Sequence, residues 1–267
     1  MSKQSIACMG PEHSYGSQAA KLVGGETILC ANYSQVVEQV STEKGKYGLL
    51  PYYNQSTGFV QPHLDALLKS GLHIVGCHIL PICHVAAGNT NAETVYSHPQ
   101  GLAQCSKYLQ EHCSSKTHTP TSSTSQAAKL AKEHNGLAIC NMDAANAHDL
   151  SISKKDIGNL QSDQNKTYFL LFAKKPEHVQ GSNVSTLIAI RPPKDYCGLL
   201  ADVMTVISKQ YHLSCRRILS RPEKTDSQLF YIEIETAQDD TFKNMVSDLH
   251  LLLECDAVKI LGSFSIE

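Results

Sequence analysis

The chain has 267 residues, of which 42% are apolar and 18% are charged, and its formal net charge is −2. This size and composition predict a soluble globular protein of about two domains. The near-neutral charge argues against a nucleic-acid partner, and no apolar run reaches the ~18 residues of a membrane span. Residues 6–9 are too short an apolar stretch for a signal peptide, and the ten scattered cysteines favour a reduced, cytoplasmic protein.

Short apolar strands alternate with amphipathic helices over the first 172 residues. In residues 99–110, for example, Pro99 suits a first helical turn, and Leu102, Cys105 and Leu109 recur at helical spacing. This alternation predicts an open α/β sheet, where ligands bind beyond the carboxyl ends of strands. Strands are expected at residues 6–9, 27–30, 47–50, 93–97, 137–140 and 165–172, an extended stretch at 73–87, and helices at 17–23, 34–40, 62–70, 99–110, 121–131 and 144–148.

Four junctions between a loop and a helix are polar and poor in acids, at residues 14–17, 54–57, 97–104 and 122–125. A helix N-terminus presents unpaired N–H groups and about half a positive charge, so these junctions suit a carboxylate or phosphate. Ordinary helix capping is the alternative interpretation, because hydroxyls and amides are common caps. The repetition favours a cleft between two α/β lobes that gathers helix N-termini around a small anion.

Two Cys-His pairs resemble fragments of a metal site. Cys77-His78 and Cys83-His84 flank an apolar stretch, but no second ligand pair has the spacing of a zinc site. We therefore predict no metal, and no other cofactor is indicated.

The pattern changes after the polar linker at residues 178–182. Residues 229–234 alternate apolar and polar side chains, as in a half-buried strand, and residues 199–207 carry an apolar face at helical spacing. The order is strand, helix, strand, strand, helix, strand, which is ferredoxin-like. The expected elements are strands at 186–190, 213–219, 229–234 and 258–261, with helices at 199–207 and 242–252.

Several short motifs carry a resemblance to one family. The most specific is Ser97-His98-Pro99-Gln100, followed by Gln104-Cys105. The others are Ser123-Thr124 with Ala127-Ala128, Pro51 with Asn54 and Gly58, Thr167 with Phe169, Gly198-Leu199-Leu200, and Ser220-Arg221-Pro222. Together they resemble prephenate dehydratase followed by an ACT regulatory domain, over essentially the whole chain.

The resemblance implies a fold and an activity. Residues 1–177 would form a two-lobed α/β catalytic domain like a type II periplasmic binding protein, and residues 183–267 a βαββαβ ACT domain. The reaction would convert prephenate to phenylpyruvate, water and carbon dioxide in phenylalanine biosynthesis, with L-phenylalanine as effector. Catalytic roles are implied for Asn54, Ser97, Gln104 and Thr167. Substrate contacts are implied for His13, Ser14, Tyr53, Gln55, His98, Gln100, Ser123, Thr124 and Tyr168, and effector contacts for Gly198, Leu199, Leu200, Ser220 and Arg221.

The chemistry of that reaction fits these residue types. Prephenate is a small dianion, so an acid-poor cleft suits it. Loss of carbon dioxide supplies the electrons that expel the ring hydroxyl, and only a donor to the departing oxygen is needed. By resemblance Thr167 is that donor, acting through an oriented hydrogen bond because its hydroxyl pKa is too high for proton transfer. Asn54, Ser97 and Gln104 are neutral groups that hold the substrate without opposing its charge.

Two tyrosines depart from the family pattern together. Tyr53 stands where the family has an acid, and Tyr168 stands where it has an arginine, so the local charge sum is unchanged. A buried charge without its partner is costly, so losing the acid and the arginine together is a simpler explanation than two independent substitutions. We expect the two rings to be neighbours at the cleft, and the anchoring of carboxylates to pass to helix N–H groups, phenol hydroxyls or protonated His13.

Three functions remain open from the sequence. The first is prephenate dehydratase. The second is a related enzyme, either a prephenate decarboxylase or one that takes arogenate. The third is an inactive two-lobed ligand sensor with an ACT domain. We also expect a homodimer or homotetramer, because a ferredoxin-like sheet has an exposed edge, here at residues 186–190 or 213–219.

Overall fold

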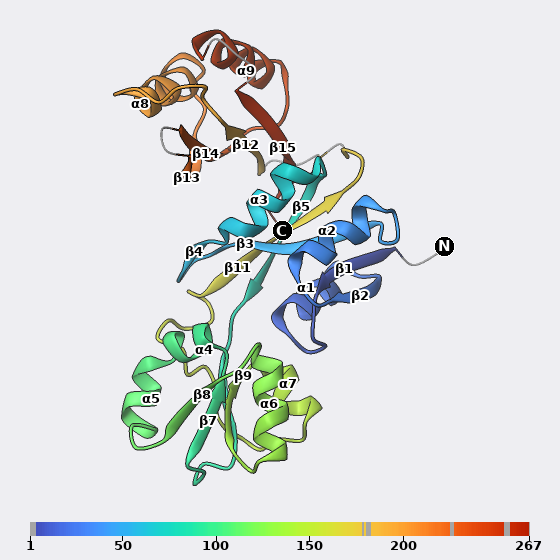
Figure 1. Ribbon diagram of the computed structural model, residues 1–267, viewed down its shortest axis with the longest axis vertical. Helices are drawn as coiled ribbons and strands as arrows, with labels where there is room; N and C mark the ends of the chain where they lie inside the picture. The colour runs from blue at the N-terminus through green and yellow to red at the C-terminus, as the bar shows by residue number, and fades with distance from the viewer. Residues whose placement is uncertain (1–3, 178, 180–182, 225–226, 254–256, 267) are drawn as a thin grey trace. The chain divides into compact units, whose positions relative to one another are not determined.

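The computed structural model describes residues 4–177, 179, 183–224, 227–253 and 257–266 (Figure 1). The chain forms two compact units. The first consists of Met1–His63 and His78–Phe169, and the second of Leu64–Cys77 and Leu170–Glu267. No helix within the described ranges is long and apolar enough to cross a membrane.

The first unit contains a sheet built from the expected N-terminal strands. Its strand order is β11-β3-β1-β2, and β1 runs parallel to both of its neighbours. Helices α1 and α2 pack against these strands (Figure 1). The elements are β1 (Ser5–Met9), α1 (Tyr15–Val23), β2 (Glu26–Cys30), α2 (Tyr33–Ser41), β3 (Tyr47–Asn54), the short β4 (Gly58–Phe59) that pairs with β3, and β11 (Lys166–Ala173).

A second sheet of the same unit has the order β10-β6-β9-β7-β8. β7 is parallel to β8 and β9, whereas β6 is antiparallel to β9. Its core is built largely from small residues such as Ala128 and Ala138, which let α6 lie close to the sheet. The two-lobed α/β prediction is thereby confirmed. The elements are β6 (Val85–Gly88), β7 (Thr94–Ser97), α4 (Pro99–Gln104), α5 (Ser106–His112), β8 (Thr117–Pro120), α6 (Thr124–Glu133), β9 (Leu137–Cys140), α7 (Met142–Ala147) and β10 (Ile152–Lys154).

The single helix expected at residues 99–110 is wrong, because the chain breaks into α4 and α5 at Cys105. Periodicity continues through the break, so the sequence pattern does not reveal it. The Asn159 side chain bonds the backbone on both sides of the break. Its Nδ2 donates to Ala103 O in α4 at 3.1 Å, and its Oδ1 accepts from Lys107 N in α5 at 3.1 Å. A distant side chain thus replaces hydrogen bonds that a continuous helix would make.

The second unit contains the ferredoxin-like arrangement that the sequence predicts. The strand order β13-β14-β12-β15 is antiparallel throughout, and a single apolar core that includes Ile188, Ile232 and Phe242 joins the sheet to both helices. The expected helix at 199–207 continues instead as a π-helix, Thr205–Gln210. The other elements are β12 (Val184–Ile190), α8 (Leu199–Met204), β13 (Cys215–Lys224), β14 (Ser227–Ile234), α9 (Asp240–Leu252) and β15 (Val258–Ser265).

Most of α3 (Gln61–Ser70) and part of β5 (His73–Pro81) belong to the second unit, so the compact units differ from a division at residues 177–183. Asp65 on α3 accepts a hydrogen bond from the Tyr231 hydroxyl at 2.7 Å and pairs with Arg221 at 2.9 Å. β5 also pairs with β15 at Ile74 and Gly262, where any Cβ at 262 would lie 2.2 Å from Ile74 O.

The sheet order decides which strand can mediate self-association. The expected edge at 186–190 is wrong, because β12 pairs with β14 on one side and β15 on the other. β13, which contains much of the alternative segment 213–219, is the terminal strand of its sheet.

We expect the protein to form a dimer or tetramer through β13, because an unpaired strand edge favours pairing with another chain. Ile218, 37% exposed on this strand, is the place to test it. Ile218→Lys should shift the mass measured by light scattering toward the monomer, whereas Leu22→Lys, at an exposed position of the first unit, should not. A wild-type protein that is monomeric at micromolar concentration would contradict the prediction.

Candidate functional site

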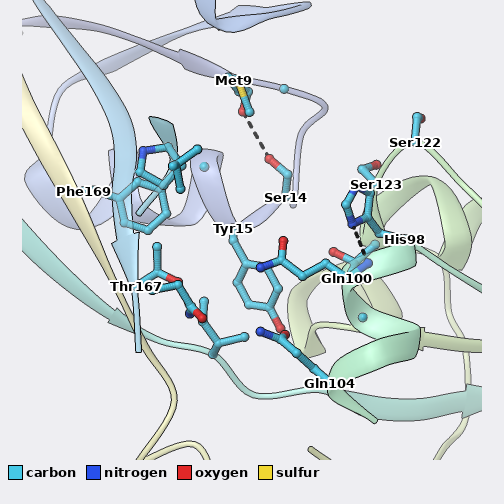
Figure 2. Close-up of a pocket in the computed structure, with 18 of the residues that line it drawn as sticks. Met9, Ser14, Tyr15, His98, Gln100, Gln104, Ser122, Ser123, Thr167 and Phe169 are labelled. Carbon is cyan, nitrogen blue, oxygen red and sulfur yellow. Dashed lines mark hydrogen bonds between the residues drawn. The ribbon is translucent and has the colours of Figure 1, made fainter. Parts of the chain in front are cut away.

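A cavity of about 340 Å³ lies within the first unit, where residues of the four polar junctions come together (Figure 2). Ser14 and Tyr15 come from the start of α1, Asn54 from the end of β3, and His98 and Gln100 from the start of α4. The remaining polar side chains are His63, His84, Gln104, Ser122, Ser123, Thr124 and Thr167, and Gly10, Gly16 and Gly101 also line the cavity. The convergence predicted from the sequence is therefore present in the structure.

The cavity is neutral. Among the residues that the structure describes, no Asp, Glu, Lys or Arg lines it. Its helices α1 and α6 begin with serine caps and have no acid in the first turn: Ser14 accepts from Ser17 N at 3.3 Å, and Ser123 from Gln126 N at 3.0 Å. Glu12 precedes the α1 cap by two residues, but its carboxylate pairs with Lys21 at 3.6 Å and does not line the cavity. Two helix N-termini with no acid in the first turn give positive potential and N–H donors, so the site favours a small anion.

One wall carries Thr167 beside Asn54, and both side chains are nearly buried, with 8% and 4% exposed. Asn54 Nδ2 donates to Thr167 Oγ1 at 2.9 Å and to Asn165 Oδ1 at 3.0 Å. Its Oδ1 accepts from Ser56 N and Thr57 N at 2.9 and 3.1 Å. Because Thr167 accepts the Asn54 bond through its oxygen, its own proton can be donated to a molecule in the cavity.

The facing wall carries amides and histidines, which come from the start and the length of α4 and from His84 just before β6. Gln104 Oε1 lies 2.8 Å from His84 Nε2, and the Gln100 side chain donates to Thr57 Oγ1 at 3.1 Å. Burial lowers the pKa of His84 and of His98 below the ordinary value, so both rings are uncharged near neutral pH. Figure 2 shows Gln100 and Gln104 extending from α4 toward the side that carries Thr167 and Phe169.

Apolar side chains complete the lining of the cavity. They are Met9, Leu49, Pro51, Val60, Ile82 and Phe169. A molecule bound in the cavity therefore contacts both hydrogen-bond donors and apolar side chains. In the described part of the chain, no group of three or more His, Cys, Asp or Glu side chains could hold a metal.

Comparisons with known proteins agree with this architecture. The family model for prephenate dehydratase matches residues 6–177. The chain belongs to the prephenate dehydratase family. A prephenate dehydratase of Lactococcus lactis is 28% identical, with 98% of this chain and 97% of the relative covered.

Solved structures extend the likeness to the whole fold. A prephenate dehydratase from Arthrobacter aurescens in complex with L-Phe is 22% identical, with a TM-score of 0.86 and coverage of 98% of this chain and 89% of that one. A structure described as a novel type of quorum quenching acylase gives a TM-score of 0.84 at 20% identity, covering 99% of this chain and 98% of that chain. At these identities the structures show the fold alone.

The structure places only some of the family-implied residues at the cavity. Ser14, Asn54, His98, Gln100, Gln104, Ser123, Thr124 and Thr167 line it. Ser97, His13, Gln55, Tyr53 and Tyr168 are not among its lining residues. Ser97 is fully buried and donates to Ile139 O at 2.8 Å, so it joins β7 to β9 instead of facing a ligand.

The other residues outside the lining also have local partners. His13 has a φ of 63° and accepts at its backbone oxygen from Asn141 Nδ2 at 2.7 Å. Gln55 Oε1 accepts from Lys166 N at 3.0 Å. These contacts join segments around the cavity without contributing to its surface.

Sequence reasoning missed Tyr15, His63, His84, Ser122 and Phe169 as lining residues. Ser122 belonged to a junction already singled out, and Phe169 to a quoted motif, so proximity to those motifs was an available signal. His84 was considered only as half of a metal-like pair. Nothing in its local sequence shows that its ring reaches Gln104, twenty residues further along the chain.

The residues implied for effector contact lie in the second unit. Gly198, with a φ of 96°, is the N-cap of α8, and Leu199 is buried in the core beneath it, with Leu200 packed against that core. Ser220 lies 3.2 Å from Gln228 Oε1, and Arg221 pairs with Asp65. Arg221 therefore already has a carboxylate partner.

The expected contact between Tyr53 and Tyr168 is confirmed: their ring centroids are 5.8 Å apart with an interplanar angle of 67°. Tyr53 also meets Phe59 edge to face at 5.2 Å, and Tyr52 lies 6.3 Å from Tyr168. The expected place at the cavity surface is not found, since neither ring lines the cavity. The two positions where the resemblance implied an acid and an arginine thus belong to an aromatic cluster with Tyr52 and Phe59.

We expect the two tyrosines to behave as a unit in stability. Tyr168→Arg alone should lower the thermal midpoint, because it leaves a cation among aromatic rings without a carboxylate. The double variant Tyr53→Glu with Tyr168→Arg should lose less than the sum of the single losses, because the two charges then pair. Additive losses in thermal denaturation would show that the pair is not coupled.

Proposed function

We propose that the protein is a prephenate dehydratase, an enzyme that converts the dianion prephenate to phenylpyruvate, carbon dioxide and water. The observation that carries the proposal is the Thr167 hydroxyl, oriented by Asn54 Nδ2 at 2.9 Å in a neutral cavity that two helix N-termini line. Such a cavity accepts a small anion and offers an oriented donor, without a charged acid or base that the reaction does not need.

The reaction needs little from the protein beyond orientation and one donor. The bond between the ring and its carboxylate breaks, and its electron pair forms the new ring double bond. The neighbouring ring double bond shifts to the carbon that bears the hydroxyl. The carbon–oxygen bond breaks, and the oxygen leaves with the electron pair of that bond as hydroxide, which takes a proton from solvent to become water. Thr167 donates a hydrogen bond to this oxygen as negative charge develops on it. Asn54, by donating to Thr167 Oγ1, both aims and polarises that hydroxyl.

The N–H groups at the starts of α1 and α6, together with the Gln104 amide, are the donors for the substrate carboxylates. The apolar side chains around Thr167 surround the carboxylate that is lost. Placing that carboxylate against Phe169 and Ile82, away from donors, favours its conversion to neutral carbon dioxide.

Two observations bear on the alternatives. Arogenate carries an ammonium group where prephenate has a keto group, and no carboxylate lines the described cavity to receive it. Decarboxylation that leaves the ring hydroxyl in place needs no donor to that oxygen, whereas Thr167 is held as one. The neutral cavity thus favours prephenate, and the oriented hydroxyl favours dehydration over simple decarboxylation or ligand sensing.

Residues 183–267 are proposed to act as an ACT regulatory domain that takes L-phenylalanine as effector, in a cytoplasmic homo-oligomer. The support is the ferredoxin-like order of strands and helices, with the Gly198 turn at the start of α8 and the Ser220-Arg221-Pro222 motif on β13.

Phenylpyruvate formation by the purified protein is the direct test of activity. Thr167→Val keeps the shape of the side chain and removes the donor, so it should lower kcat about a hundredfold or more, as loss of one oxyanion donor does. Thr167→Ser, which restores a hydroxyl, should recover part of that loss. Unchanged turnover in Thr167→Val would exclude this role for Thr167, and a wild type that binds prephenate without turnover would favour the sensor.

We expect prephenate to be preferred over arogenate by at least about tenfold in kcat/KM, because the ammonium group of arogenate would lose water without gaining a charged partner. Steady-state rates with the two substrates measure this ratio directly. Equal or higher kcat/KM for arogenate would contradict the proposed specificity.

A further inference from the structure

One buried side chain connects two sides of the cavity and has no part in the steps above. His84 follows β5, is 3% exposed and lines the cavity. Its Nε2 lies 2.8 Å from Gln104 Oε1 on α4, and its Nδ1 lies 3.3 Å from the hydroxyl of Tyr15 on α1. The Tyr15 ring meets the imidazole edge to face at 5.8 Å. Gln104, His84 and Tyr15 are thus linked in series by contacts between their side chains.

The partners of His84 define its protonation. Gln104 Oε1 can only accept, so His84 Nε2 must carry the proton of that hydrogen bond. Burial lowers the pKa of His84 and raises that of the Tyr15 phenol well above its usual range, so both groups are neutral near pH 7. His84 Nδ1 is then an acceptor. The Tyr15 hydroxyl has one proton, which can be donated either to Cys83 O at 2.8 Å or to His84 Nδ1 at 3.3 Å.

We propose that His84 is a positioning residue: as the Nε2–H tautomer it holds the Gln104 oxygen and thereby turns the Gln104 NH₂ group toward a carboxylate in the cavity. The identity of that carboxylate as part of prephenate rests on the proposed function. The opposite tautomer would bind the amide nitrogen and present the Gln104 oxygen to the anion, which repels it. A neutral histidine therefore selects the face of the amide without adding charge to the site.

His63 offers a matched comparison. It is also buried, at 6% exposed, and also lines the cavity, and burial lowers its pKa. Its Nδ1, however, lies 2.7 Å from the backbone oxygen of Pro51, and its ring stands against Tyr33. His63 fixes a backbone segment, whereas His84 fixes a side chain that faces the ligand.

The first test is kinetic. His84→Phe keeps a ring but removes the donor, and kcat/KM should fall about ten- to a hundredfold, the range found when the partner that orients a binding group is lost. The loss should fall mainly on KM, because the carboxylate is held in both ground and transition states. His84→Gln carries a side-chain N–H at similar reach and should recover much of the affinity. Comparable losses in both variants would indicate a role other than donation to Gln104.

The second test asks whether His84 acts through Gln104. Once Gln104→Leu has removed the amide, adding His84→Phe should cost less than about threefold further, because residues that act as a unit are not additive. Adding His63→Phe to Gln104→Leu should instead cost the same factor as His63→Phe in the wild type. Thermal midpoints of all variants identify any that fail to fold. Full additivity of His84→Phe and Gln104→Leu would overturn the proposal.

The third test needs no substrate. NMR of the imidazole nitrogens in the full-length protein at pH 7 should show His84 as the neutral Nε2–H tautomer, and Gln104→Leu should weaken that preference. An Nδ1–H tautomer in the wild type would overturn the proposal. If the wild type does not turn prephenate over, the proposed function fails by itself. The role of His84 is then still decided by two measurements. One is its tautomer, and the other is the dissociation constant of prephenate in the His84→Phe and Gln104→Leu variants and their combination.

Discussion

The hydrogen bond between Asn54 and Thr167 joins the two segments on which the site depends. Asn54 ends β3 and Thr167 lies near the start of β11, 113 residues later in the chain, and the two strands are neighbours in one sheet. The bond uses the Thr167 oxygen as acceptor and so leaves the hydroxyl proton for the cavity. Asn54 can do this because its own carbonyl is fixed by backbone N–H groups of the following turn. In the proposed function, the donor for the reaction is thus set by one amide–hydroxyl hydrogen bond, and by the backbone N–H groups that fix the amide, instead of by a charge.

In the proposed function, the site binds an anion without a cation. Charged side chains are absent from the lining in the described residues, and burial keeps His84 and His98 neutral. Partial charges of backbone N–H groups at helix starts replace a lysine or arginine. These partial charges are fixed by the fold. A buried lysine or arginine would need a carboxylate partner, and that carboxylate would repel a dianion, whereas backbone N–H groups need no such partner. Outside the lining, Tyr53 and Tyr168 likewise place two neutral rings in contact, at positions where the family resemblance implied an acid and an arginine.

Precise placement of amides then becomes the means of recognition. Neutral amides can present either a donor or an acceptor, and only the donor suits a carboxylate. Gln104 is held at its oxygen by His84, whereas Gln100 donates through its NH₂ group to Thr57 Oγ1. In the second unit, Arg221 of the Ser220-Arg221-Pro222 motif is paired with Asp65 of α3, which links β13 to a helix that sequence reasoning assigned to the other domain.

The sequence by itself determined the order of strands and helices, the ferredoxin-like second unit and the four acid-poor junctions, because these depend on periodicity and caps among near neighbours. It also identified Thr167, Asn54 and Gln104 through motifs. Tertiary structure alone decided that Ser97 is a buried link, that β12 is internal and that His84 lines the cavity. The physical reason is that strand neighbours and side-chain contacts at the ends of elements come from packing between distant segments. Asn159 breaking the helix at Cys105 from over fifty residues away, and His84 reaching Gln104, leave no trace in local pattern.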